Sequence, residues 1–222
     1  QRSVRCHRSD PALITDDGDS LAPGFLIAAP KLEGSPFEQA VILMVHHDDE
    51  GAMGFIINKP VDIDFGSLLQ SAEQPITSDL DEEIFEQIVL FGGLVRVEQL
   101  WVLFQQEGDL TAEPTVRPDP LGGLQDISEL AFHPDWKLAG SGTVIESFAR
   151  GEREGAYRPV IGYAGWGAGQ LEGEIEDGSW LAIDFEEELL LDTPPEECWE
   201  AALDTMGLDP TSFMMMGRGG TA

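Results

Sequence analysis

Positive charge is scarce in this sequence. Only 12 of the 222 residues are Lys or Arg, against 42 Asp or Glu, so the formal net charge is −30 at pH 7. Most faces of such a protein would repel a duplex phosphate backbone, because nucleic-acid binding relies on Lys and Arg side chains that neutralise phosphates. The one cluster of arginines, at positions 2, 5 and 8, lies in a segment without apolar periodicity. We therefore expect no generic nucleic-acid binding.

Long apolar runs and cysteines are scarce as well. No window reaches the about 18 consecutive apolar residues of a membrane-spanning helix, and the first residues carry no apolar signal-peptide core. The two cysteines, Cys6 and Cys198, are too few for a disulfide framework and lack the spacing of a metal knuckle. We expect a cytoplasmic protein that does not associate with membranes.

The excess of acidic residues is uneven along the chain. No Lys or Arg occurs between Arg158 and Arg218, whereas acidic residues accumulate from Glu172 to Glu200. Such a run usually forms a solvated face, and a site for a cation or a basic partner is the alternative. So large an acid excess is also typical of adaptation to concentrated salt, where the Debye length falls to about 3 Å and self-repulsion is screened. We predict a salt-adapted protein.

Apolar runs bounded by Gly and Pro predict short strands and helices. Strands are predicted at 24–29, 40–45, 52–58, 88–91, 100–104, 159–164 and 180–183. Helices are predicted after a cap at Ser78, at 143–150, at 170–175 and from Pro194 to Gly207. Residues 105–140 hold several prolines and glycines and are predicted to be irregular, with at most one short helix.

The domain organisation follows from the same pattern. Strands cluster early and helices are interspersed without regular alternation, which favours an α+β fold. No break in composition occurs between residues 21 and 210, so we predict one domain there. Residues 1–20 are predicted to form a flexible N-terminal arm, and residues 211–222 a loose C-terminal tail.

A glycine-rich segment, Gly165–Gly169, stands between a predicted strand and a predicted helix, where backbone N–H groups can bind a phosphate. Its spacing matches neither G-x-G-x-x-G nor a Walker loop, and the acidic residues that follow would oppose an anion. Two other interpretations remain. One is a tight turn over which Trp166 packs. The other is a recognition surface of Trp166, Gln170 and Glu174, since an aromatic anchor beside polar groups is typical of an interface hot spot.

Catalytic and metal-binding patterns are lacking. The cluster His46–Glu50 holds groups that can bind metals, but no second set of ligands with metal-site spacing accompanies it, so we expect a solvated turn and no metal. No G-x-S-x-G nucleophile elbow occurs, and Cys198 lies in a predicted amphipathic helix, where a buried thiol is inert. The sequence predicts no catalytic residue and no cofactor.

Several words of the sequence are typical of one family. The chain reads FLIAAP from Phe25, GAMGFIINKP from Gly51, FGGLV from Phe91, GYAGWGAGQL from Gly162 and SWL from Ser179. With these words in this order, the chain resembles the AlgH/YqgE family over about residues 21–210. The resemblance implies a compact bacterial α+β domain with a strongly bent, partly barrel-like mixed sheet flanked by helices, and no established enzymatic activity or cofactor. The name of the family derives from a regulatory role in alginate production.

Two positions depart from the family pattern. Leu94 stands where the family usually has Pro after the paired glycines, so this turn is expected to be less rigid. The chain ends in Gly220-Thr221-Ala222 in place of the frequent Gly-His-Ala, so any role of that histidine is absent here.

Two functional hypotheses follow. The first is a non-enzymatic interaction or regulatory protein that binds a protein partner of unknown identity. The alternative is an enzyme or small-ligand receptor with a pocket near Gly165–Gly169 and Asn58-Lys59, where Lys59 supplies one of the few positive charges. The candidate recognition surface comprises Asn58, Lys59, Trp166, Gln170 and Glu174.

Overall fold

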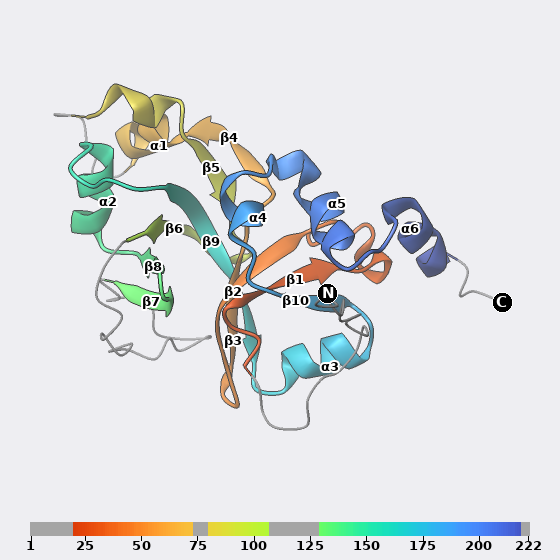
Figure 1. The fold of residues 1–222 in the computed structure, drawn as a ribbon. Helices are drawn as coiled ribbons and strands as arrows, with labels where there is room; N and C mark the ends of the chain where they lie inside the picture. The colour runs from red at the N-terminus through yellow and green to blue at the C-terminus, as the bar shows by residue number, and fades with distance from the viewer. Residues whose placement is uncertain (1–19, 73–79, 107–128, 219–222) are drawn as a thin grey trace, which may run out of the picture.

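A computed structural model describes residues 20–72, 80–106 and 129–218 of the chain. In this part, ten strands form one curled sheet that six α-helices and two 3-10 helices flank (Figure 1). The strands are β1 (Gly24–Ala28), β2 (Val41–Asp48), β3 (Gly51–Ile56), β4 (Pro60–Asp64), β5 (Ile88–Phe91), β6 (Val95–Gln105), β7 (Leu130–His133), β8 (Trp136–Ala139), β9 (Tyr157–Gly167) and β10 (Trp180–Asp184). The helices are η1 (Pro30–Leu32), α1 (Phe65–Ser71), η2 (Glu82–Phe85), α2 (Gly142–Ala149), α3 (Gln170–Glu176), α4 (Glu187–Leu191), α5 (Pro195–Thr205) and α6 (Pro210–Arg218).

The main path of the sheet runs in the order β10-β1-β2-β3-β9-β6-β8-β7. Neighbours on this path pair antiparallel, whereas β5 pairs parallel with β9 and antiparallel with β4. The sheet curls so strongly that its two ends approach each other at one point without pairing, where the ring of His133 at the end of β7 stacks on Phe185 just after β10, with ring centroids 4.4 Å apart. The predicted α+β domain with a strongly bent, partly barrel-like mixed sheet is confirmed.

Both faces of the sheet are buried because its apolar side chains alternate between two core clusters. In β1, Phe25 and Ile27 join the cluster that also contains Trp199 and Leu203 of α5. Leu26 and Ala28 point to the opposite cluster, which includes Leu171 of α3. Figure 1 shows α5 and α3 on opposite sides of these strands. The predicted helix face with Trp199 and Leu203 is therefore buried against the sheet.

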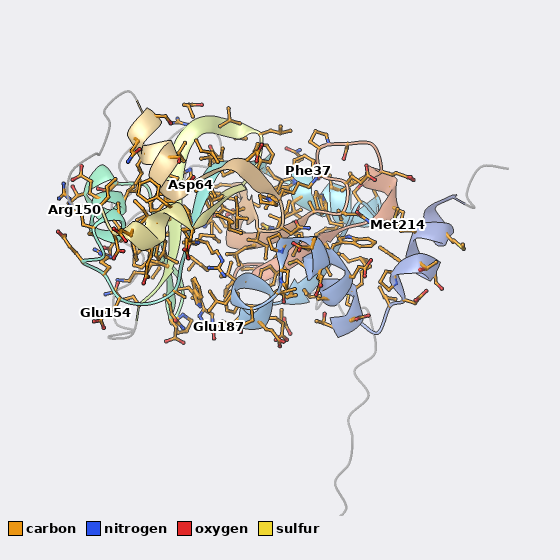
Figure 2. The ribbon with its side chains drawn as sticks, turned by 90° about the horizontal axis from the view of Figure 1, so that it is seen from above. Phe37, Asp64, Arg150, Glu154, Glu187 and Met214 are labelled. Carbon is orange, nitrogen blue, oxygen red and sulfur yellow. The ribbon has the colours of Figure 1, made fainter. Side chains whose placement is uncertain are left out.

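A third cluster fills the other end of the molecule. Phe65 of α1, Ile84 of η2 and Phe148 of α2 pack there against Val102 and Phe104 of β6. Figure 2 shows this end with Arg150 and Glu154 labelled, while Phe37 and Met214 lie toward the opposite end. The three clusters form one domain with two helix-covered ends.

Several elements differ from the expectations. Residues 130–139, predicted to be irregular, form the hairpin β7–β8, in which Pro134 occupies the turn rather than a strand. The strand predicted to stop at Pro60 ends earlier, at Ile56, and Pro60 begins β4, a position where a strand tolerates the missing N–H. Helix α1 was not anticipated at all. The helix predicted from Ser78 is the 3-10 helix η2, which Asp81 caps, and Ser78 itself lies outside the described residues.

The predicted arm and tail have different outcomes. Residues 1–19 of the arm lie outside the described residues. Most of the tail, predicted to be loose, instead forms α6, whose start Asp209 caps by accepting a hydrogen bond from Ser212 N at 2.7 Å. Phe213 and Met214 of this helix pack against the core cluster that contains Trp199. This apolar contact explains why the segment is helical.

Among the described helices, none is both long enough and apolar enough to cross a membrane.

Candidate functional site

Two tryptophans and two residues of α3 form a hydrogen-bonded cluster, which we call the Glu174 cluster. Oε2 of Glu174 accepts hydrogen bonds from Nε1 of Trp166 at 2.9 Å and from Nε1 of Trp180 at 2.8 Å. Oε1 accepts from Nε2 of Gln170 at 2.9 Å. Gln170 and Glu174 lie four positions apart on α3 and so share one helix face. The carboxylate therefore satisfies two indole N–H groups that are cut off from water.

The Glu174 cluster joins α3 to the sheet. Trp166 and Trp180 are 3% and 2% exposed, and their ring planes cross at 83° with centroids 6.2 Å apart. The side-chain oxygen of Gln170 also accepts the backbone N–H of Gly167 at 3.2 Å. Three of the five predicted site residues thus contact one another. Trp180 is the member that was missed, although the word SWL marked its position.

Most of the glycine-rich segment forms a strand rather than the expected turn. Gly165, Trp166 and Gly167 belong to β9 and pair with Met53, Ala52 and Gly51 of β3. The chain reverses only at Ala168 and at Gly169, whose φ of 71° lies in the left-handed region. The prediction that Trp166 packs over a turn is wrong, because its side chain is buried in the strand.

The side chains of Asn58 and Lys59 form hydrogen bonds with the backbone of the loop between η1 and β2. The Asn58 side chain accepts the backbone N–H of Val41 and donates to the carbonyl of Gln39, both at 2.8 Å. The Lys59 ammonium donates to the carbonyl of Pro36 at 2.8 Å. Desolvation by burial lowers the pKa of Lys59, and the negative charge of Glu38 partly opposes this. The contacts of both side chains hold the backbone of the loop.

The two groups of candidate residues do not meet. Trp166 pairs with Ala52 inside β3, whereas Asn58 lies beyond the end of β3 at Ile56, in the bend that precedes β4. Among the described residues, no hydrogen bond joins the two groups, because Asn58 and Lys59 bond to the backbone at or before the start of β2 and Trp166 and Gln170 bond to Glu174. A depression of about 160 Å³, open solvent included, has another lining: Ala28, Ala29, Pro30, Glu33, Glu38, Gln39, Trp199 and Met214. Its volume is below the roughly 300 Å³ at which small-molecule pockets begin.

The side chains of His46 and His47 each contact other residues of the protein. His46 Nε2 lies 3.2 Å from Asp48 Oδ2. His47 accepts the backbone N–H of Leu21 on Nδ1 at 3.0 Å, and its Nε2 lies 3.1 Å from Oε1 of Glu172. Within the described ranges, no three His, Cys, Asp or Glu side chains are grouped so that they could hold a metal ion.

Cys198 lies inside α5, 1% exposed, with its Sγ 3.7 Å from the carbonyl oxygen of Leu189. Burial raises the pKa of this thiol to about 12. Because the thiolate is the reactive form, the thiol is inert near neutral pH.

A surface feature that was missed lies beside the word FGGLV. Leu94 and Val97 are 54% and 50% exposed, although both are apolar. We call the segment 94–98 the apolar rim. Beneath it, the backbone of Gly93 runs against Tyr163, so that a Cβ on Gly93 would collide with the Tyr163 carbonyl. Gly162, with φ of 67°, has no room for a Cβ either, because the carbonyl of Gly93 lies 2.5 Å from its place.

Comparison with known proteins agrees with these motifs. The sequence model described as AlgH-like matches residues 25–211. A UPF0301 protein of Anaeromyxobacter sp. (strain K) is 34% identical over 203 residues, which cover 91% of this chain and 96% of that protein. A UPF0301 protein of Ralstonia pickettii (strain 12J) is 35% identical over 206 residues, with the same shares covered.

Solved structures share the fold. The solution structure of the AlgH protein from Pseudomonas aeruginosa is 28% identical, with a TM-score of 0.65, and the match covers 95% of this chain and all of that one. A crystal structure of a protein from Corynebacterium diphtheriae is 17% identical, with a TM-score of 0.59 and 90% of both chains covered, and shows the similarity of the fold alone. The words FLIAAP, FGGLV and GYAGWGAGQL, the curled sheet and these matches agree, and the chain belongs to the AlgH-like family.

Proposed function

We propose that this protein is a non-enzymatic interaction protein with a regulatory role, and that it binds a protein partner through the apolar rim. The observation that carries the proposal is the exposure of Leu94 and Val97 on a backbone that close glycine contacts hold in place. Exposed apolar side chains mark interaction sites, and on a rigid frame they can be buried by a partner with little loss of conformational entropy.

The rim owes its position to an irregularity in the β6–β9 ladder. Val95 pairs with Tyr163 and Leu100 with Ile161, so four residues of β6 stand opposite Gly162 alone. Arg96 within this stretch has φ of 48°, a left-handed conformation that is costly for a residue with a Cβ. Bulges of this kind aim side chains away from the sheet. Strain at a surface bulge is consistent with a functional role for the segment.

The five residues of the predicted recognition surface support the proposal indirectly. Trp166 and Glu174 bond to each other, and Asn58 and Lys59 bond to the backbone of the η1–β2 loop. We infer that these side chains hold the backbone of the domain in place and that the apolar rim contacts the partner protein. We also propose a cytoplasmic location, because Cys198 is a free thiol inside a chain with too few cysteines for a disulfide framework.

The experiment compares a rim variant with a matched surface variant. A photo-crosslinker at Glu98, the last residue of the rim, captures partners from a native extract at native salt, with and without the double substitution L94D and V97D. We expect the enrichment of the captured protein to fall at least tenfold in the double variant. The control is Met215→Asp on α6, since Met215 is 68% exposed and far from the rim in sequence.

Unchanged thermal melts must show that both variants fold. An equal set of captured proteins with and without the rim substitutions, or substrate turnover in an activity screen, would contradict the proposal.

A further inference from the structure

The strand β10 forms one end of the sheet, and its backbone groups alternate in direction. Ala29 N donates to Ser179 O at 3.0 Å, which fixes this residue pair as a hydrogen-bonded one. In an antiparallel ladder every second pair is bonded, so Leu181 and Ile183 bond to β1. The N–H and C=O groups of Trp180, Ala182 and Asp184 therefore point away from β1.

These outward groups are unpaired within the described part of the chain. There β10 pairs with β1 and with no further strand, and the hydrogen bonds found in the loops and side chains do not involve the backbone of Ala182 or Asp184. A row of free N–H and C=O groups is a template for another strand. Beta-strand addition is the recognition mode that uses such an edge.

The charge around the edge selects the kind of strand. Asp184 and Glu186 are exposed at one end of β10, and Glu176 and Asp177 at the other. The Nζ of Lys31 lies 3.5 Å from Oδ2 of Asp177 and offsets part of the negative charge at that end. The whole chain nevertheless has a formal net charge of −30. A second copy would bring the same acids together and be repelled, whereas a basic segment would find opposite charge at both ends.

The two faces of β10 predict the pattern of the incoming strand. Ala182 and Asp184 point to the face on which Trp180 packs, and both are exposed. Leu181 and Ile183 point to the other face, where they are half-buried against the core cluster of α5. Neighbouring strands align side chains of the same face about 5 Å apart. The incoming strand would therefore be polar and basic on one face and apolar on the other.

We propose that the free edge of β10 accepts an extended basic segment of a partner protein as an added strand. Its Lys or Arg side chains lie beside Ala182 and Asp184, and its alternate apolar side chains lie beside Leu181 and Ile183. This contact is separate from the apolar rim on β6.

The test uses a synthetic peptide of alternating Lys and Val, seven residues long and blocked at both ends, added to the whole chain. Amide hydrogen exchange is followed by NMR. The N–H groups of Ala182 and Asp184 should exchange rapidly in the free protein and become at least tenfold slower with peptide. Those of Leu181 and Ile183 are already bonded to β1 and should change little. Raising NaCl from 0.1 M to 1 M should weaken binding at least tenfold, and a Glu-Val peptide should not bind.

Two variants separate the backbone contribution from the charge. Ala182→Pro removes the outward N–H and leaves the bonds to β1 in place, so peptide binding should be lost, whereas Ala182→Val keeps the N–H and the binding. Asp184→Lys should weaken binding at least tenfold in a strand whose backbone is intact. The double rim variant L94D and V97D should bind the peptide like the unsubstituted chain.

Four results would each overturn the proposal. They are unchanged exchange at Ala182 and Asp184 at millimolar peptide, undiminished binding by both Ala182→Pro and Asp184→Lys, equal binding of the Glu-Val peptide, and peptide-free protection of these amides that grows with protein concentration. The last would assign the edge to a second copy of this chain. The rim experiment does not depend on any of them.

Discussion

Glu174 shows how a single acidic residue can hold an element in place. Helix α3 has seven residues, and its N-cap is Gly169, which offers no side-chain cap. Such a short helix is unstable by itself, so its position depends on tertiary contacts. The carboxylate supplies them by accepting from two buried indoles and from Gln170. In a chain with 42 acidic residues, this one acts through its hydrogen bonds rather than through its charge.

Replacing Glu174 by Ala should lower the free energy of unfolding by about 2–6 kcal/mol, because two buried indole N–H groups would lose their acceptor at about 1–3 kcal/mol each. Glu174→Gln should cost less, since its amide oxygen can still accept. Urea denaturation measures both. The matched control is Glu176→Ala, an exposed acid on the same helix. A loss at Glu174 no larger than at Glu176 would show that the indoles find other partners.

Among the helices, α1 has the most explicit local signal. Asp64 is its N-cap and accepts hydrogen bonds from the backbone N–H and the hydroxyl of Ser67, both at 2.7 Å. These bonds lower the pKa of Asp64. Phe65 and Leu69 then bury the helix against the third core cluster. The pattern D-x-x-S before an apolar pair could have been recognised in the sequence, and it was missed because the segment is short.

Asp64→Ala should lower the free energy of unfolding by about 1 kcal/mol, as the loss of an N-cap does. Because the pKa of Asp64 is lower in the folded state, its contribution is present above the unfolded value near 3.8 and is lost as pH falls through the folded value. The difference between Asp64→Ala and the unsubstituted chain should therefore vanish in acid. Urea melts at pH 7 and below pH 3 measure it, with Asp62→Ala, an exposed neighbour, as control. A difference that persists in acid would contradict the cap.

Elements with apolar runs between Gly and Pro were predictable from the sequence. The strand predicted at 88–91 is β5 as the structure has it, and the strand predicted at 180–183 differs from β10 by one residue. The sequence pattern predicted the wrong secondary structure where pairing with a distant strand determines it. The segment Gly165–Gly167 has the composition of a turn, yet it is a strand because β3 offers it a partner. The hairpin β7–β8 was hidden because each strand has only four residues in a proline-rich stretch.

The candidate site was predictable only in its local part. Gln170 and Glu174 are four positions apart, so their contact follows from helix geometry. Their link to Trp180 and their distance from Asn58 depend on the curl of the sheet, which no local pattern encodes. The exposure of Leu94 and Val97 was not predicted, because a hydropathy pattern does not show which side of a bulge faces water.

The molecule as a whole is a curled sheet that carries far more negative than positive charge. The ion pairs found between described residues include Lys31–Asp177, Lys137–Glu129, Arg150–Glu146 and Arg153–Glu129, and two of them share Glu129. With 42 acids against 12 bases, most carboxylates have no basic partner available. Folding brings these carboxylates closer together, which costs stability that mobile cations can screen.

The melting temperature should therefore rise by several degrees between 0.1 M and 2 M NaCl, as the Debye length contracts from about 10 Å to under about 3 Å. Differential scanning calorimetry measures the rise. Concentrated salt also acts by exclusion from the protein surface, so a parallel series with a neutral osmolyte is needed. A melting temperature that is flat in salt, or a rise that the osmolyte matches fully, would contradict salt adaptation.

The order of strands in the sheet also determines when each strand can pair while the chain is being synthesised. The first strand lies between β2 and β10, and its partner Trp180 is about 150 positions away from Ala28. At roughly 5–20 residues per second, a ribosome needs on the order of 8–30 s to translate the chain between them. During that interval the nascent chain displays the apolar edge of Gly24–Ala28 and lacks Trp199, which covers it from α5. We expect the negative charge of the chain that emerges behind it to repel neighbouring nascent copies until the last strand arrives.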